Sequence, residues 1–236
     1  MKVFIVYDNR THKPDLQTGW GFSVYISTDK GDVLFDTGDD PEKLSLNLNL
    51  LNLSVKDIDH VVLSHYHWDH VGGLQAILER NDTCNLFYST GFPRDFCVDK
   101  LKIDNSRCHP VDTYTLIYED VFVTRSFKKL FRPVEVGLCL LDKEKRVYLI
   151  TGCAHPGIED MVRDVEKFFR KKVYAVIGGF HFYHQSYMQI KIRVQKLKKL
   201  GVEKVLPTHC TGETGLKVFR EVFGPYDTGA GCELNL

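Results

Sequence analysis

Residues that can bind a metal ion are concentrated in one segment of the 236-residue chain, Ser64-His65-Tyr66-His67-Trp68-Asp69-His70. In an extended chain, residues i and i+2 point to the same side, so His65 and His67 can converge on one ion. Asp69 and His70 follow where the chain turns into a helix and can face a second ion. The ordinary alternative is a polar loop, but burying so many ionisable groups without a ligand is costly. Imidazole and carboxylate ligands suit Zn²⁺, Mn²⁺ or Fe²⁺, so the segment predicts a metal site.

Three later histidines share a second pattern, in which a β-type run is followed by small residues and then by the histidine. They are His155 after Thr151-Gly152-Cys153-Ala154, His181 after Gly178-Gly179-Phe180, and His209 after Pro207-Thr208. Loops at strand ends commonly carry functional side chains, because the strands hold those loops in place. One histidine of this kind would more often be structural. Three of them, together with the first cluster, predict delivery of their side chains to one common edge.

The elements that must position these side chains follow from the pattern of apolar residues. The expected strands are Val3–Tyr7, Gly21–Ser27, Asp32–Phe35, Asp59–Ser64, Thr115–Ile117, Val121–Thr124, Val134–Leu141, Arg146–Ile150, Val173–Ile177 and Lys204–Leu206. The expected helices are Val71–Arg80, Ile158–Arg170, Tyr187–Leu200 and Gly215–Phe223. Within Pro41–Asn52, the spacing of Leu44, Leu48 and Leu51 fits a helix, whereas the Leu–Asn alternation fits a strand. The stretch Asn81–Pro110 is expected to be a loop-rich insertion that shapes a substrate pocket.

Composition limits the classes of protein that the chain can represent. It has 31 Lys+Arg and 31 Asp+Glu, so its zero net charge gives no overall field for nucleic acid or an anionic membrane. No apolar run approaches the ~18–20 residues of a membrane span, and the N-terminus lacks the features of a signal peptide. We therefore expect a cytoplasmic protein with no membrane or nucleic-acid partner. Its oligomeric state is not predicted.

The seven cysteines are scattered along the chain and include no C-x-x-C pair. Disulfide frameworks favour an even number of cysteines in a short secreted chain, so reduced thiols are predicted. Cys153 and Cys210 each lie close to one of the three later histidines.

The pattern His-x-His-x-Asp-His after a strand closely resembles the metallo-β-lactamase superfamily. Asp36, in Phe35-Asp36-Thr37-Gly38, resembles the aspartate that lies beneath the metal site in that family. The order of elements also agrees along nearly the whole chain. The resemblance implies a four-layer αβ/βα sandwich in a single domain spanning residues 1–236. Two central sheets would be faced by helices, with the metals at one edge between the sheets.

The resemblance also implies a set of ligands for one or two divalent ions, with zinc favoured and manganese or iron as alternatives. His209 stands at the position of the last metal-binding histidine of the superfamily, and His155 is expected to be the third imidazole of the first ion. The complete expected set is His65, His67, Asp69, His70, His155 and His209.

One departure from the superfamily pattern concerns the bridging ligand. Most members carry a Gly-His-Thr/Ser loop in mid-chain and a later Gly-Asp whose carboxylate bridges two metals. No such histidine loop occurs between Glu119 and Glu135, and the chain reads Gly152-Cys153 where Gly-Asp is expected. Cys153 could replace the bridging carboxylate as a thiolate, or it could be a small buried thiol while His155 alone provides the ligand there.

The combination FDTG, SHYHWDHVGGL, TGCAHPGI, GGFH and PTHCTG resembles the branch described as metal-dependent hydrolases of β-lactamase superfamily II. This resemblance implies a hydrolase that uses a metal-bound hydroxide on an ester, amide or phosphoester of a small molecule. Asp69 would orient the nucleophile, and His181 would contact substrate or transfer a proton. The branch includes enzymes similar to 7,8-dihydropterin-6-methyl-4-(β-D-ribofuranosyl)-aminobenzene-5′-phosphate synthase, so a transferase of that kind is the alternative.

Other side chains fit a functional or an ordinary role. Aromatic residues near the histidine loops could stack on a planar substrate or simply pack in the core: Tyr66, Trp68, Phe180, Phe182 and Tyr183. Arginines in the pocket-forming stretches could bind a phosphate or be solvated: Arg94, Arg107, Arg125 and Arg132. A diiron redox enzyme is disfavoured because the second position of the first motif is histidine rather than glutamate. The intact ligand set also disfavours a non-enzymatic scaffold.

Overall fold

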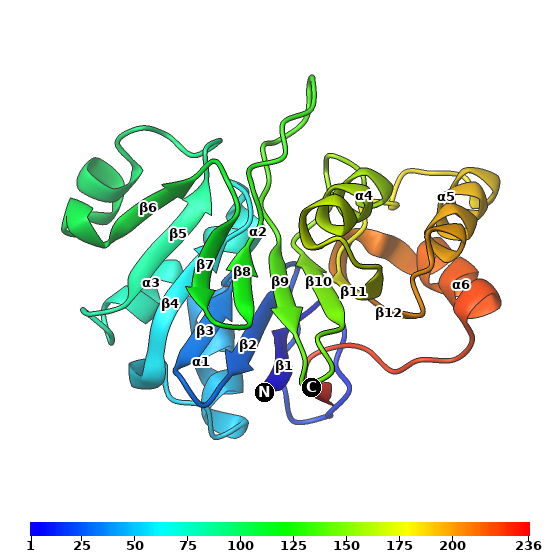
Figure 1. The fold of residues 1–236 in the computed structure, drawn as a ribbon. Coiled ribbons are helices and arrows are strands. Elements are labelled where there is room, and N and C mark those ends of the chain that lie inside the picture. Colours follow the sequence, from blue (N-terminus) through cyan, green and yellow to red (C-terminus); the bar gives the residue numbers. More distant parts are fainter.

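The computed structural model describes residues 1–236 and contains two β-sheets between layers of helices (Figure 1). The seven-stranded sheet has the order β13-β1-β2-β3-β4-β5-β6, and the six-stranded sheet has the order β12-β11-β10-β9-β8-β7. The first sheet comprises β1 (Lys2–Tyr7), β2 (Ser23–Ser27), β3 (Asp32–Phe35), β4 (Ile58–Leu63), β5 (Asn85–Ser89), β6 (Cys108–Val111) and β13 (Glu233–Asn235). The second comprises β7 (Thr115–Tyr118), β8 (Val121–Val123), β9 (Leu138–Leu141), β10 (Val147–Thr151), β11 (Val173–Gly178) and β12 (Lys204–Pro207).

The helices lie on the outer faces of the two sheets. The α-helices are α1 (Pro41–Leu50), α2 (Trp68–Val71), α3 (Leu74–Leu78), α4 (Ile158–Phe169), α5 (Tyr187–Leu200) and α6 (Gly212–Phe223). Short helical segments occur at η1 (Val55–Asp57), η2 (Phe96–Leu101), η3 (Asn105–Arg107) and η4 (His209–Thr211). None of these helices combines the length and the apolar character needed to cross a membrane.

Three apolar clusters hold the layers together. One lies between the sheets and includes Val24 and Ile150, while α1 and α3 pack on the outer face of the first sheet through residues such as Leu44. Helices α4, α5 and α6 cover the second sheet, with Val162 as one contact. Burying a side chain of this size contributes about 1.5–3 kcal/mol. The predicted four-layer αβ/βα sandwich in a single domain is confirmed.

Parallel strands bring the candidate site residues to one edge of each sheet. Strands β3 to β6 are parallel neighbours, as are β10 to β12. Their carboxyl ends therefore lie together, and the chain leaves them at Asp36, Ser64, Gly152, Gly179 and Thr208. The connection between β8 and β9 extends beyond the sheets as a two-stranded arm (Figure 1), and Phe131 near its tip is 93% exposed.

The ambiguous segment Pro41–Asn52 forms a helix over most of its length. Proline is favoured in the first turn of a helix because it has no amide hydrogen to satisfy, and Pro41 occupies that position. The Asp40 side chain caps the helix by accepting hydrogen bonds from the backbone N–H groups of Glu42 and Lys43, at 2.9 and 3.1 Å. Leu44 is buried against the first sheet. The proline and the capping aspartate at its N-terminal end favour the helix over the strand.

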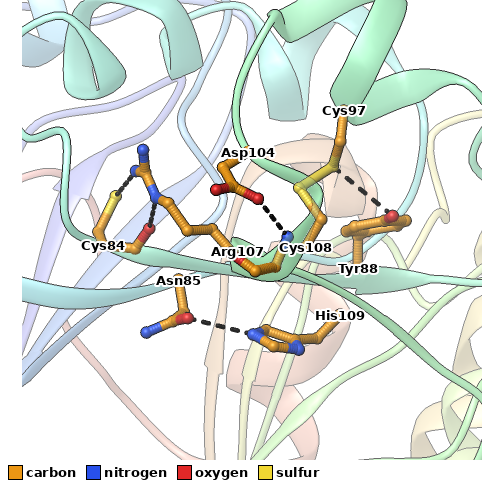
Figure 2. The surroundings of a disulfide bond; sticks show 9 residues. Cys84, Asn85, Tyr88, Cys97, Asp104, Arg107, Cys108 and His109 are labelled. Carbon is orange, nitrogen blue, oxygen red and sulfur yellow. Dashed lines mark hydrogen bonds between the residues drawn. A yellow bond between two sulfur atoms is a disulfide. The ribbon is translucent and has the colours of Figure 1, made fainter.

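Two expectations for the region between residues 81 and 111 are wrong. It supplies strands β5 and β6 to the first sheet instead of only a loop. The prediction of reduced thiols fails at Cys97 and Cys108, which form a disulfide (Figure 2). An odd total of cysteines does not prevent one pair from meeting, and the segment between these two folds back so that Cys108 begins β6. The other five cysteines are free, as expected, and all are buried.

Candidate metal centre

Three imidazoles converge on one point at the shared edge of the sheets. The Nε2 atom of His65 lies 3.1 Å from Nδ1 of His67 and 3.2 Å from Nε2 of His155. With bonds of ~2.0–2.1 Å, the nitrogens around a tetrahedral zinc ion are separated by roughly 3.3 Å. Two of the three separations therefore match one zinc ion, and the third, between His67 and His155, is within 4.8 Å.

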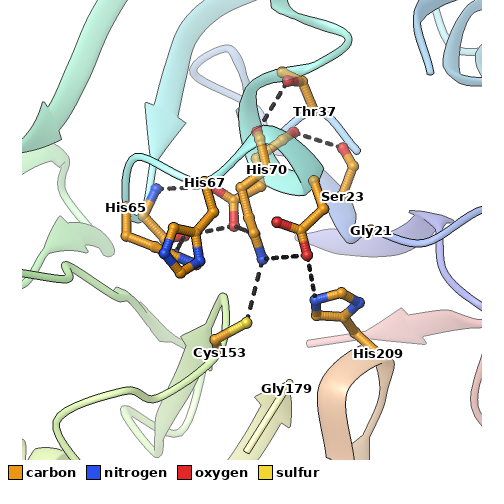
Figure 3. A network of polar contacts seen from close by, with 12 residues as sticks. Gly21, Ser23, Thr37, His65, His67, His70, Cys153, Gly179 and His209 are labelled. Atoms are coloured by element: carbon orange, nitrogen blue, oxygen red, sulfur yellow. Dashed lines mark hydrogen bonds and ion pairs between the residues drawn. The ribbon is translucent and has the colours of Figure 1, made fainter. Parts of the chain in front are cut away.

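A second group of ligand atoms lies beside the first. The Oδ2 atom of Asp69 is 3.2 Å from Nε2 of His209 and 3.9 Å from Nε2 of His70, and all three residues are buried. Figure 3 shows His70 and His209 approaching from different segments of the chain. The six residues predicted as ligands are thus brought together in two groups of three.

Asp36, which follows β3, contacts the first of these segments from beneath, the place that the family resemblance implied. Its carboxylate accepts hydrogen bonds from the backbone N–H and the hydroxyl of Ser64, and it contacts Nδ1 of His70, each at 2.7 Å. The Ser64 hydroxyl also lies 2.9 Å from Nδ1 of His65. Contacts of this kind fix the ring orientation of metal-binding histidines, and here they leave both Nε2 atoms directed into the centre.

Asp8 and Asn9 play the same part for His209, although no sequence pattern above predicts them. Asp8 accepts the backbone N–H of His209 at 2.9 Å, and the side-chain oxygen of Asn9 lies 2.9 Å from its Nδ1. The buried Nε2 atom of His209 faces the Asp69 carboxylate at 3.2 Å, which fits a metal ligand. Both residues directly follow β1, so the strand-end pattern that picked out the three later histidines could have found them.

Glu135 is a fully buried acid at the centre, and nothing in the sequence pattern identifies it. One carboxylate oxygen accepts the backbone N–H groups of Cys153 and Ala154 at 3.0 and 2.8 Å, and the other accepts that of His155 at 2.8 Å. Burial raises the pKa of Glu135 to about 7, while these three N–H donors act in the opposite direction. Glu135 therefore holds the loop that carries His155.

Several residues at this edge of the sheets have left-handed backbone conformations, which residues other than glycine rarely adopt. The φ angles are 56° at Asp36, 53° at Ala154, 48° at His181 and 45° at His209. Such conformations cost on the order of 1–3 kcal/mol each and persist where surrounding contacts fix them. Their concentration at this edge is typical of a functional site.

The protonation states of the metal-free chain suit cation binding. Burial lowers the pKa of His65, and burial with the neighbouring imidazoles lowers that of His155 to about 3, so both rings are neutral. Burial opposes ionisation of Asp69, but His209 and His70 outweigh it and lower its pKa to about 2. Burial likewise opposes the charge on His70, yet the Asp36 carboxylate raises its pKa to about 9. Metal binding would release that proton.

Cys153 lies between the two ligand groups. Its Sγ atom is 3.3 Å from Nε2 of His70 (Figure 3). The preceding Gly152 permits this approach, because a Cβ atom there would come within 2.2 Å of the Ser64 hydroxyl oxygen. The sulfur therefore lies at the centre of the site and not in a remote part of the core.

His181 borders the first group and is partly exposed. Its ring centroid is 4.4 Å from that of His155, and its Nδ1 atom is buried without a hydrogen-bond partner. Its ligand atom also lies within 4.8 Å of those of Cys153 and His155. Its predicted role in substrate contact or proton transfer remains a prediction.

A cavity of ≈ 270 Å³ opens beside His155 and His181 and is lined mainly by charged residues. The cations are Lys129, Arg132, Arg163, Arg193 and Lys196, and the acids are Glu159 and Asp160. Glu159 pairs with Arg193 at 2.6 Å, and Asp160 pairs with Lys129 at 3.0 Å. Arg132 and Lys196 form no ion pair, so the cavity carries an excess of positive charge next to the candidate metal centre.

Some of the arginines and aromatic residues named in the sequence analysis lie at the candidate site, and others lie in the core or in ion pairs away from it. Arg132 lines the cavity, whereas Arg125 pairs with Asp164 at 2.7 Å. Phe180 and Phe182 are buried in the core, while Tyr66, Trp68 and Tyr183 are exposed. Trp20 was not predicted; its ring centroid lies 5.5 Å from those of Tyr183 and His209.

Comparisons with known proteins agree with this architecture. The family model described as the metallo-β-lactamase superfamily matches residues 19–209. A curated relative from Methanocaldococcus jannaschii, 7,8-dihydropterin-6-methyl-4-(beta-D-ribofuranosyl)-aminobenzene-5′-phosphate synthase, is 32% identical over 251 residues, covering 88% of this chain and 85% of the relative.

Two solved structures share the fold. Tm1679, a metal-dependent hydrolase of the β-lactamase superfamily, superimposes with a TM-score of 0.79 at 24% identity, covering 100% of this chain and 99% of the other. The short form of human tRNase Z gives a TM-score of 0.61 at 15% identity, covering 89% and 92% of the two chains. At these identities the likeness concerns the fold alone.

Proposed function

The chain belongs to the metallo-β-lactamase superfamily, and we propose that it is a metal-dependent hydrolase acting on an ester, amide or phosphoester bond of a small molecule. The observation that carries this proposal is the pair of three-residue ligand groups at one edge of the sheets. Their residues come from distant segments, and their buried atoms point toward each other. A structural role alone gives no reason for such an arrangement.

In this proposal His65, His67 and His155 hold one divalent ion, and Asp69, His70 and His209 hold a second. Imidazole-rich sites with a nearby thiol favour zinc over manganese. When bound, such ions lower the pKa of coordinated water from 15.7 to about 7 and polarise the oxygen of the substrate.

The remaining chemistry falls to the side chains. Asp69, ionised at neutral pH, would bind the second ion through one carboxylate oxygen and orient the attacking nucleophile through the other. His181 borders the cavity and contacts the substrate or carries a proton to the leaving group. Asp36, Asn9 and Glu135 position ligands without touching the substrate.

A second candidate function is a transferase like the Methanocaldococcus jannaschii synthase. The cationic cavity favours it, because the name of that enzyme includes a 5′-phosphate. A guanidinium or ammonium group without a carboxylate partner is free to bind phosphate, as with Arg132 and Lys196. For this chain we propose a substrate with a phosphate group, whichever bond is broken or formed.

Metal analysis of purified protein, followed by assays on ester, phosphodiester and pterin substrates, tests the proposal. Replacing Asp69 with Ala should abolish turnover while circular dichroism remains that of the folded chain, because Asp69 lies at the site edge and leaves no core cavity. Full activity in this variant would refute the proposed chemistry. Formation of a carbon–carbon bond with the pterin substrate, without hydrolysis of the others, would establish the transferase.

The cavity is tested with a phosphorylated substrate and its unphosphorylated analogue. Replacing Arg132 or Lys196 with Ala should raise KM for the phosphorylated compound about tenfold or more and leave the analogue unaffected. Lys199, exposed on the same helix as Lys196 but outside the cavity, provides the matched control. An equal effect on both compounds would contradict phosphate binding there.

A further inference from the structure

Cys153 and Cys210 lie next to each other at the candidate metal centre, and neither belongs to the two ligand groups of the proposed function. We propose that Cys153 and Cys210 both bind the metal ion held by Asp69, His70 and His209, and that this thiolate pair makes the centre selective for thiophilic ions. This inference rests on the metal centre of the proposed function and extends it with Cys210 as a ligand.

The two sulfur atoms are in contact at the edge of the ligand cluster. Their Sγ atoms are 3.2 Å apart, and the side chains are buried, with exposures of 3% and 4%. Cys153 approaches Nε2 of His70 at 3.3 Å. The ligand atoms of Cys153, His209 and Cys210 all lie within 4.8 Å of one another. Cys153 thus contacts the second ligand group directly, and Cys210 lies beside its His209.

The backbone around Cys210 directs its sulfur inward. Cys210 follows His209, whose left-handed conformation turns the chain, and its Sγ atom accepts the backbone N–H of His181 at 3.3 Å. The loop after β11 leaves room for the sulfur, because a Cβ atom on Gly179 would lie 2.6 Å from it. The sulfur is therefore held beside His209 and Cys153.

A free cysteine is often only a small apolar side chain, as Cys139 is in the core of the second sheet. The pair differs because its neighbours are imidazoles and a carboxylate and not aliphatic groups. On metal binding each S–H bond breaks, the sulfur lone pair passes to the ion and the proton passes to solvent. Thiolates favour zinc, cobalt and cadmium over magnesium and manganese.

Cobalt substitution of the whole chain tests the inference through absorption rather than activity. Cobalt-loaded wild-type protein should have a near-ultraviolet thiolate-to-metal charge-transfer band. Cys210→Ser and Cys153→Ser should each lose about half its intensity, and the double variant should lose it all. Cys232→Ser, which removes a free cysteine outside the site, should keep the full band. Cadmium-113 NMR of wild-type protein repeats the test without any variant, because each sulfur ligand displaces the resonance downfield.

The outcomes separate this inference from the proposed function. Full cobalt content with no charge-transfer band would overturn thiolate ligation while leaving the metal centre intact. A band unchanged in Cys210→Ser, or a cadmium shift that corresponds to one sulfur, would remove Cys210 from the ligand set. Failure to bind cobalt at all would overturn both the centre and the thiolate pair.

Discussion

Replacing Glu135 with Gln tests whether a residue that touches no substrate controls the metal centre. One carboxylate oxygen of Glu135 accepts the backbone N–H groups of Cys153 and Ala154, and the other accepts that of His155. The amide oxygen of glutamine can keep the first two contacts, but its NH₂ group would then face the N–H of His155. One buried donor loses its partner, which costs about 1–3 kcal/mol. Alanine would leave all three donors unpaired, at roughly three times that cost, so glutamine is the better probe.

The expected result is a folded protein with weakened metal binding. Because the loop would shift where His155 joins the first ligand group, affinity for zinc should fall about 10–100-fold, the range found when groups behind metal ligands are removed. Competition with a chromophoric chelator measures affinity, and urea unfolding of the metal-free chain measures the free energy of unfolding.

Asp142→Asn provides the matched control. Asp142 is also a buried carboxylate that accepts backbone N–H groups, from Glu144 at 3.0 Å and Arg146 at 2.9 Å, but it lies in the turn between β9 and β10. Asparagine keeps both contacts through Oδ1, but its NH₂ group would face Nε of Arg146, which donates to Oδ2 at 2.6 Å. The replacement should therefore destabilise the fold to a similar extent and leave zinc affinity unchanged. Wild-type affinity in Glu135→Gln, or an equal loss in Asp142→Asn, would refute the positioning role.

Three further predictions concern other parts of the molecule. His181→Ala should keep its metal content and lose 10²–10⁴-fold in rate by the usual scale of acid–base catalysis, whereas loss of an ion would make His181 a ligand. Burial opposes ionisation of Asp142, but its hydrogen bonds from Arg146 keep its pKa below the ordinary 3.8. Its contribution to stability is therefore present above pH 3.8 and lost as the pH falls further, so urea titrations of wild type and Asp142→Asn should converge in acid; a constant difference would contradict this. Replacing both Cys97 and Cys108 with Ser should lower the free energy of unfolding by about 3 kcal/mol, from the entropy of the short loop they close, and an unchanged urea midpoint would show that the pair adds nothing.

The fold and most of the candidate site follow from patterns within short segments. His65, His67, Asp69 and His70 are neighbours in sequence, and their spacing after one strand already limits where they can point. The later histidines were found because each follows a β-type run by a few residues. Parallel strands end at the same edge, so this local pattern was sufficient to predict that His155 would meet the first cluster.

The supporting groups are harder to predict because their contacts join segments that are distant in sequence. Asp8 and His209 are separated by 201 positions, and no local spacing relates them. Glu135 lies in the connection before β9, where nothing distinguishes it from a surface acid until the sheet is assembled. The disulfide of Cys97 was missed for a related reason, since the parity of the cysteine count limits the number of pairs but not their existence.

These supporting contacts have a common arrangement that links metal binding to the packing of the sheets. Asn9 follows a strand of the first sheet and orients His209, which follows a strand of the second. Glu135, which precedes one strand, likewise fixes the loop of His155 after another. A ligand side chain therefore keeps its direction only while the two segments that make each contact keep their relative positions. The apolar layer between the sheets thus maintains the geometry of the centre, although none of its side chains needs to touch a metal ion.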